Sequence, residues 1–213
     1  MRRLLGMLVL VGLLLGAAGQ ARAQRAPQFG VALGLNVTTV SAPADVGVRQ
    51  MVTGGVVMKM RVAGPLSLQP ELLLSQKGTT VQGGGGSIRY GAGYVNLPVL
   101  LRLDGPSLGP VSLYGVAGGF GGVKVFEQQR AGGNLSFPLN SGTSFFRRTD
   151  AGLSAGVGGT IPLGGERRLN LVLRYEHGLV DVARSVDEQP YDQAPFPASA
   201  ETRTWAVTMR FGV

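Results

Sequence analysis

The chain has 213 residues, a formal net charge of +8, only 15% charged residues and no cysteine. Together with a positive mean hydropathy of +0.19, so few charges disfavour both an intrinsically disordered chain and an ordinary soluble enzyme with a charged surface. The absence of cysteine excludes a disulfide framework. The basic residues are scattered without any Lys/Arg run, so nucleic acid is not an expected partner.

The beginning of the chain has the pattern of an export signal. Two arginines precede an apolar stretch over residues 4–18, and Ala21-Arg22-Ala23 fits the small-x-small cleavage rule. We therefore expect residues 1–23 to be removed as a signal peptide and residues 24–213 to form one domain. No later stretch reaches 18 consecutive apolar residues, so no transmembrane helix is expected.

Beyond the signal, apolar and small or polar residues alternate with a period of two, which predicts β-strands. Near the end of the chain, for example, Trp205, Val207 and Met209 fall on one face, and Thr204 and Ala206 fall on the other. Eight segments carry the pattern: residues 29–39, 53–62, 66–77, 90–103, 111–126, 149–163, 168–182 and 202–213.

The connections between these segments alternate strictly between long and short. Short turns lie at residues 63–65, 104–110 and 164–166, and long loops lie at residues 40–50, 78–89, 127–148 and 183–201. Transmembrane β-barrels have an even number of strands, short periplasmic turns and longer external loops. The chain is therefore predicted to be all-β, as an eight-stranded antiparallel transmembrane β-barrel with up-and-down topology, located in the outer membrane.

Two further arguments agree with a closed barrel. Facing residues of a hairpin point to the same side of the sheet. Three hairpins are expected to fold about residues 64, 107 and 165, and in each of them polar positions then lie opposite polar positions. The last strand must close against the first, because lipid cannot satisfy an open edge. We expect the barrel-assembly machinery to recognise this last strand, from Thr202 to Val213.

Prolines and glycines complicate the strand pattern. Pro70 and Pro98 lie inside predicted strands, where each removes a hydrogen-bond donor from the ladder, and local bulges are one way to absorb them. Residues 111–126 and 149–163 are rich in glycine. We expect these glycines to let the barrel bend and to make room for long side chains opposite.

The polar faces are expected to line the barrel interior. Eight strands leave an interior only wide enough for side chains, and buried charges must be paired. We therefore predict a packed plug of ion pairs, with an anion-selective pore lining as the alternative, and we expect Lys59 to lie near Glu71 across their hairpin. The predicted interior residues are Lys59, Arg61, Gln69, Glu71, Asn96, Arg102, Arg174, Glu176 and Arg210.

Three stretches of the sequence resemble a known family. They are Leu-Gln-Pro-Glu-Leu-Leu-Leu-Ser-Gln-Lys-Gly at residues 68–78, Tyr-Val-Asn-Leu-Pro-Val-Leu-Leu-Arg at residues 94–102, and Arg-Tyr-Glu-His-Gly-Leu at residues 174–179. The chain is similar here to the PorT-like outer-membrane β-barrel family. The resemblance covers essentially the whole chain after the signal and implies an eight-stranded barrel of a Gram-negative outer membrane, without implying an activity.

Two of the predicted long loops, residues 127–148 and 183–201, combine arginine, aromatic and acidic residues. Arginine and aromatic residues dominate interfaces, and loops on a rigid scaffold commonly carry binding. We expect both loops to leave the same rim, to face the cell exterior and to contact a protein or glycan; the alternative is that they only cap the barrel. The candidate contact residues are Arg130, Phe145, Phe146, Arg147, Tyr191 and Phe196.

Aromatic residues near the predicted strand ends indicate two girdles at the membrane interfaces. The expected girdle residues are Phe29, Tyr114 and Phe211 on the turn side and Tyr90, Tyr94 and Phe126 on the loop side.

No catalytic residue, metal site or cofactor is predicted. The one histidine, His177, has no nucleophile elbow to serve, and one histidine without cysteine makes no ligand cluster. A structural or interaction role is expected. Three alternatives stay open: a narrow channel, a soluble periplasmic ligand-binding barrel with an apolar interior, and a barrel enzyme that would use Asp150, His177, Asp181 and Ser185 at the loop rim.

Overall fold

The computed structural model describes eight stretches of the chain. They are residues 26–41, 46–47, 49–83, 86–131, 136–138, 146–165, 167–180 and 201–212. The signal-peptide prediction and parts of the predicted loops therefore lie outside the described residues. Within the described stretches, no helix is long and apolar enough to cross a membrane.

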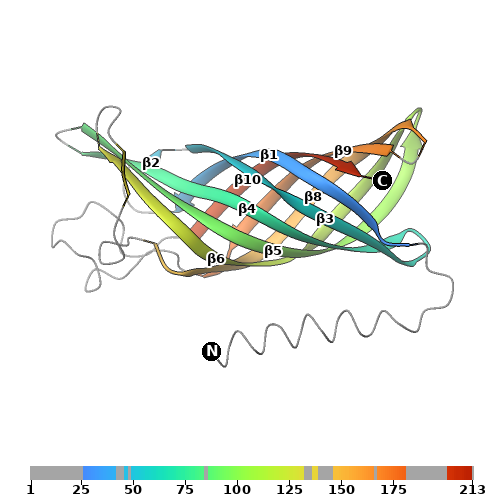
Figure 1. Cartoon of the computed structure of the whole chain (residues 1–213), viewed down its shortest axis with the longest axis horizontal. Helices are drawn as coiled ribbons and strands as arrows, with labels where there is room; N and C mark the ends of the chain where they lie inside the picture. The colour runs from blue at the N-terminus through green and yellow to red at the C-terminus, as the bar shows by residue number, and fades with distance from the viewer. Residues whose placement is uncertain are drawn as a thin grey trace, which may run out of the picture.

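Within the described stretches, eight long strands form the body of the protein. Figure 1 shows them wrapped side by side around one axis. They are β1 (Gln28–Ser41), β3 (Arg49–Ala63), β4 (Leu66–Gly83), β5 (Gly86–Leu108), β6 (Val111–Ala131), β8 (Thr149–Gly164), β9 (Arg167–Gly178) and β10 (Glu201–Gly212). Two short strands lie beside them: β2 (Val46–Gly47) pairs with β4, and β7 (Ser136–Pro138) pairs with β6.

The long strands close into a barrel. Each pairs antiparallel with its neighbour in the order β1-β3-β4-β5-β6-β8-β9-β10. The ring is completed by β1 and β10, which pair from Gly30↔Gly212 to Ser41↔Glu201. Closure leaves no long edge unpaired, which is the condition for crossing lipid with strands. The predicted eight-stranded antiparallel barrel is confirmed.

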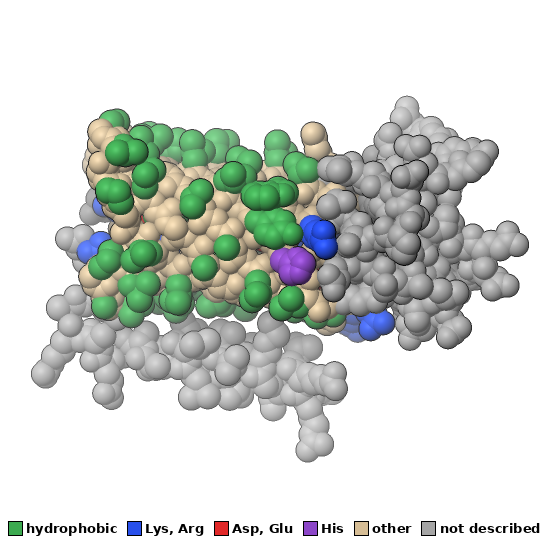
Figure 2. Space-filling model, turned by 180° about the vertical axis from the view of Figure 1, so that it is seen from behind, with side chains coloured by type: hydrophobic (Ala, Val, Ile, Leu, Met, Phe, Trp, Pro, Cys, Tyr) green, Lys and Arg blue, Asp and Glu red, His purple; other side chains and the backbone are tan. Residues whose placement is uncertain are grey.

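The two faces of the wall differ in polarity, as the alternation predicts. Outward-pointing side chains are aliphatic or aromatic, and large ones such as Leu33 and Trp205 are 60% and 52% exposed. Figure 2 shows these apolar side chains spread over the outer surface of the strands. Their neighbours in sequence point inward and are mostly polar and buried. This polarity is the reverse of a soluble ligand-binding barrel and matches a wall facing lipid.

The short connections lie together at one end of the barrel. The β3–β4 hairpin folds about Gly64, which has φ +49°, and Arg61 faces Ser67 as the parity argument requires. The β5–β6 hairpin folds about Gly109 with φ +59°, not about residue 107, because β5 continues to Leu108 after an irregularity between Asp104 and Ser107. From Tyr94↔Lys124 to Asp104↔Tyr114, even residues still face even residues, so the predicted parity holds over this part of the hairpin.

The region 78–89, predicted as a loop, is instead part of a long hairpin. β4 and β5 stay in register from Gly78↔Gly91 to Gly83↔Gly86. The cause is visible in the sequence, because β-branched and aromatic residues flank the glycine run and favour extended pairing. The prediction of a flexible loop here was wrong, and the barrel wall is longer at this side.

The two prolines are absorbed by gaps in the ladder. Between β3 and β4, the pairs Val57↔Glu71 and Met60↔Leu68 leave Pro70 out of the ladder. Between β4 and β5, the pairs Pro70↔Val99 and Leu73↔Asn96 leave out Pro98. The register is the same on both sides of each gap, so no residue is inserted and no bulge forms there. The other edge of Pro98 stays paired, opposite Phe120 of β6.

Glycines make room for long side chains inside the barrel, as predicted. A Cβ on Gly158 would lie 2.4 Å from the ring of Tyr114, and one on Gly122 would lie 2.0 Å from Oδ1 of Asn96. The narrow interior of an eight-stranded barrel therefore depends on missing side chains in β6 and β8.

Candidate functional site

A network of ion pairs fills the middle of the barrel. Glu71 of β4 is its centre and is 2% exposed. Its Oε2 accepts a hydrogen bond of 2.8 Å from Nη1 of Arg174, and its Oε1 lies 2.7 Å from Nη2 of Arg210. Gln69 donates a further bond of 2.7 Å to Oε1. A buried carboxylate is stable only when paired and hydrogen-bonded in this way.

The network continues toward the loop end. Arg174 Nη2 lies 3.1 Å from Glu176, and Lys77 Nζ lies 3.6 Å from Glu176 and 2.7 Å from Asp150. The Lys77 ammonium also sits 4.5 Å from the centre of the Phe120 ring, a cation–π contact. These charges alternate in sign and neutralise one another within the interior.

The pairs cross the lumen from one wall to the other. In the closed order of eight strands, β9 is the fourth neighbour of β4 in either direction, so the two strands face each other across the barrel. The Glu71–Arg174 pair joins these opposite walls. A second bond from β4, between Lys77 and Asp150, reaches β8, the third neighbour of β4 in the ring. Side chains from distant walls therefore meet inside the lumen at this level.

A second cluster lies nearer the turns. Asp104 accepts from Lys59 Nζ at 2.8 Å and from Arg102 Nε at 2.7 Å. Arg102 also donates to Asn170 and Thr160, at 3.1 and 2.9 Å, and its guanidinium stacks 3.5 Å from the Tyr114 ring centre. Arg102 is thus held on every side, in the manner that suits a planar guanidinium.

The structure locates each residue of the predicted interior set. Seven are buried: Gln69, Glu71, Asn96, Arg102, Arg174, Glu176 and Arg210. Lys59 is partly buried and pairs with Asp104, so the expected contact with Glu71 was wrong. Arg61 is exposed, because it lies one inward position beyond Lys59, where β3 reaches the turn end and the interior opens to solvent.

Sequence reasoning missed three members of the network: Lys77, Asp104 and Asp150. Lys77 has the inward parity of Gln69 and Glu71, and Asp150 has the inward parity of the polar face of β8. Parity alone could have found both. Asp104 was placed in a turn, because the extent of β5 was underestimated.

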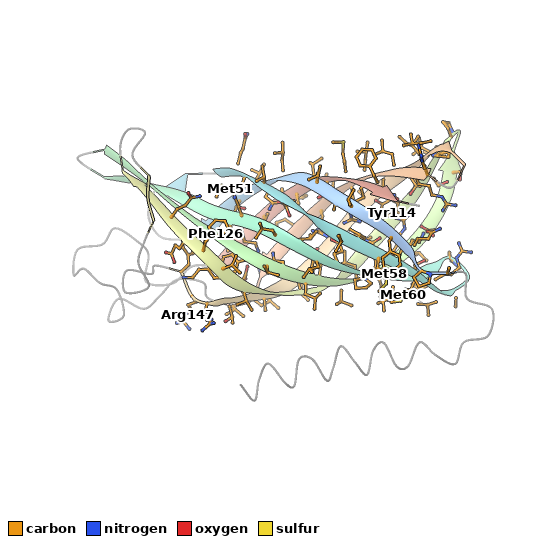
Figure 3. All side chains as sticks on the ribbon, in the orientation of Figure 1. Met51, Met58, Met60, Tyr114, Phe126 and Arg147 are labelled. Carbon is orange, nitrogen blue, oxygen red and sulfur yellow. The ribbon has the colours of Figure 1, made fainter. Side chains whose placement is uncertain are left out.

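The predicted loop contacts fall in different places. Phe146 is 2% exposed, so it is not available to a partner as expected. Its amide donates to Glu127 Oε1, its carbonyl accepts from Lys124 Nζ, and burial of the ring follows from this anchoring. Arg147 is exposed at the loop end (Figure 3), and Arg130 lies in β6 with an undescribed side chain. Phe145, Tyr191 and Phe196 lie outside the described residues.

The girdle prediction is partly wrong. Phe29, Phe211 and Phe126 are on the outer face and exposed. Tyr94 and Tyr114 point inward and are buried, because they occupy inward positions of β5 and β6. The side chain of Tyr90 is not described. An outer aromatic pair that was not predicted is formed by Tyr175 and Trp205, with ring centres 4.9 Å apart.

The described residues assemble no catalytic or metal cluster. His177 lies on the outer surface, as the purple side chain in Figure 2 shows, and stacks 6.3 Å from Tyr175. Asp150 points into the interior and pairs with Lys77. The wall of the barrel therefore separates the two described residues of the enzyme alternative, and Asp181 and Ser185 lie outside the described stretches. No group of three potential metal ligands occurs within these stretches.

A closed barrel with an apolar exterior and a polar interior defines an integral outer-membrane β-barrel protein. The chain belongs to the family described as "Outer membrane protein beta-barrel domain", whose model matches residues 18–184. The outer-membrane location is thereby confirmed, and the soluble periplasmic alternative was wrong. The PorT-like assignment within this broad family stays a prediction.

Comparison with solved structures finds three outer-membrane proteins that are similar to the chain to different degrees. OprG from Pseudomonas aeruginosa is 14% identical, with a TM-score of 0.55 over 89% of this chain and 96% of that chain. Neisserial surface protein A is 11% identical with a TM-score of 0.46, covering 89% and 98% of the two chains. Ail of Yersinia pestis is 11% identical with a TM-score of 0.42, covering 87% and 98%. The likeness to OprG supports the fold alone. No curated protein sequence matches the chain.

Proposed function

We propose that the protein is a non-conducting barrel of the outer membrane that presents its loop end to an external protein or glycan. The observation that carries the first half is the pairing of Glu71 with Arg174 across the lumen, 2.8 Å between Oε2 and Nη1. Ions could pass only if these buried charges separated, which leaves each of them uncompensated in a low-dielectric interior.

The second half rests on the shape of the loop end. A transmembrane β-strand needs roughly 9–11 residues to cross a bilayer. β4, β5 and β6 have 18, 23 and 21 residues, whereas β9 and β10 have 12 each. Part of this extra length lies at the loop end, where β5 and β6 stay paired out to Ile88↔Ala131, beyond the last β6–β8 pair at Val123↔Thr149 (Figure 1). A paired sheet is a rigid platform, and rigid scaffolds with loops commonly carry binding.

The orientation follows the general rule for such barrels, with short turns in the periplasm and long connections outside. We further propose that the barrel-assembly machinery engages β10, whose outward residues Trp205, Val207, Met209 and Phe211 form a continuous apolar row. Its inward neighbours are buried and include Arg210, so the strand also delivers one charge to the plug.

Planar-bilayer recording tests the closed lumen. Purified protein inserted into a bilayer should show no steady current, and a variant with Glu71, Lys77, Asp150 and Arg174 all replaced by alanine should conduct, because both side-chain pairs that cross the lumen are truncated. A steady ohmic current through the unmodified protein would contradict the closed lumen.

Whole cells displaying the protein test the contact role on an array of immobilised glycans and extracellular proteins. The matched variant replaces residues 183–200 with a short Gly/Ser segment and leaves every described strand intact. Signal that disappears in this variant supports the proposal. Equal signal from both, or none from either, contradicts a role for this connection.

A further inference from the structure

The turn end of the interior contains a small cavity. Its volume is about 50 Å³, and its polar lining includes Gln28, Lys59, Arg102, Arg168, Asn170 and Arg210. A hollow of about 30 Å³ shares Gln28, Lys59 and Arg168 with it and adds Arg61. A single water needs roughly 10–15 Å³ measured in this way. The cavity therefore has room for a few waters or for one tetrahedral oxyanion.

Positive charge exceeds negative charge around this cavity. Asp104 is the one carboxylate among the described ion pairs at this end, and it already serves both Lys59 and Arg102. Arg61 and Arg168, which line the opening, form no ion pair within the described stretches. Among the described residues, four cationic side chains thus share one acid, and this excess of positive charge attracts an anion from the aqueous side.

Arg210 contributes buried hydrogen-bond donors that lack an acceptor among the described residues. It is 3% exposed, and its Nη2 pairs with Glu71. Its Nε and Nη1 have no hydrogen-bond partner among the described residues, although Arg210 lines the cavity. Leaving a buried charged donor unsatisfied is costly, so an acceptor in the cavity would stabilise the folded barrel.

The neutral lining also offers donors. Oδ1 of Asn170 accepts from both Arg102 and Thr160, which leaves its amide nitrogen as the group it can present. Gln28 supplies another amide at the opening. A cavity bordered by guanidinium, ammonium and amide donors is complementary to an anion with several oxygens and poorly suited to a cation.

We propose that this cavity binds a phosphate group at the turn end of the barrel, the periplasmic end in the topology given above. Guanidinium groups match phosphate oxygens in pairs of parallel hydrogen bonds, which distinguishes phosphate from chloride. The same chemistry is offered by free inorganic phosphate and by the headgroup of an inner-leaflet phospholipid.

Calorimetry on the full folded protein in a maltoside detergent, which contains no phosphate, tests the proposal. Inorganic phosphate is titrated at fixed ionic strength against sodium chloride, and a short-chain phosphatidate is titrated separately below its micelle concentration. Binding of inorganic phosphate identifies a free anion as sufficient. Binding of the phosphatidate alone identifies the lipid headgroup. Heat of binding from neither overturns the proposal.

Variants locate the site without disturbing the plug. An Arg61→Gln, Arg168→Gln double variant removes two exposed cations at the opening. It should raise the dissociation constant for phosphate by about tenfold or more, as expected for lost charge-assisted hydrogen bonds. Arg203→Gln, an exposed cation at the opposite end of β10, is the control and should leave binding unchanged. Equal affinity in the double variant, or an equal loss in the control, would place any phosphate elsewhere and overturn the proposal.

Discussion

Glu71 and Arg174 lie on opposite walls of the barrel and meet at 2.8 Å in its centre, although they are 103 residues apart in sequence. Because of this contact, the stability of the barrel wall depends on two charged side chains that lie in the interior and do not contact lipid. It also means that a neutralising change on one wall is felt on the other.

Removing the carboxylate should therefore unfold the barrel more easily. Glu71→Leu leaves Arg174 and Arg210 buried without their acceptor, and the expected loss is about 3–5 kcal/mol in the free energy of unfolding. A urea titration in lipid vesicles measures it. Thr208→Val is the matched control, because Thr208 is buried in the same interior and its Oγ1 has no partner among the described residues. If both variants were as stable as the unmodified chain, the ion-pair plug would not contribute to stability.

The pair near the loop end should behave in the same way. Asp150→Asn removes the negative charge 2.7 Å from Lys77 Nζ, so that Glu176, at 3.6 Å, is the one carboxylate left beside this ammonium among the described residues. We expect a loss of about 2–3 kcal/mol, since a buried ammonium keeps a weaker acceptor. Ser154→Ala on the same strand removes a buried hydroxyl with no partner in the described chain and should change little. Stability is followed by the temperature at which the folded band on a gel is lost.

Two glycine substitutions separate interior crowding from backbone effects. Gly158→Ala places a methyl group 2.4 Å from the Tyr114 ring and 2.5 Å from the Leu171 carbonyl, and it should cost about 1–3 kcal/mol. Gly121→Ala meets nothing within 4 Å and should be neutral or slightly stabilising. Equal effects of the two changes would show that room for Tyr114 is not what the glycine provides.

The single tryptophan reports on contact with lipid. Trp205 is 52% exposed on the outer wall, so its fluorescence should be quenched strongly by brominated acyl chains and weakly by iodide in the buffer. Quenching that follows the opposite order would place this face in water and contradict the orientation of the wall.

Surface labelling of intact cells tests the topology. Single cysteines at Ser141 and Ala194 should react with a membrane-impermeant maleimide, and a cysteine at Gly165 should not, because the short turns are expected in the periplasm. Reaction at Gly165 with protection at the other two positions would invert the barrel and remove the basis for an external partner.

Much of this architecture could be predicted because period-two alternation and hairpin parity are local properties of the sequence. The inward direction of Glu71 and Arg174 follows from parity. Their contact does not follow, because it depends on which strands face each other across the lumen and on the stagger of the wall. Lys59 shows the difference: it faces inward as expected, but its partner is Asp104, two strands away.

The loop end was harder to predict for another reason. From composition alone, Phe146 is predicted to be an exposed contact residue. Its burial depends on Lys124 and Glu127, which pair with each other, and Lys124 also donates a hydrogen bond to the backbone carbonyl of Phe146. The length of the β4–β5 hairpin was hidden by its glycines, which lower strand propensity without preventing pairing.

The closure of the barrel between β1 and β10 has a consequence for the kinetics of folding. Glu71 lies in β4, near the beginning of the barrel sequence, whereas its partners Arg174 and Arg210 lie in β9 and β10, the last two strands. β10 is also the strand that completes the ring by pairing with β1. Until that strand arrives, the carboxylate needs water, and an open, partly inserted sheet would carry it unpaired. Insertion, closure and neutralisation of the interior are thus expected as one late event, with a slow rate set by contacts between distant parts of the chain.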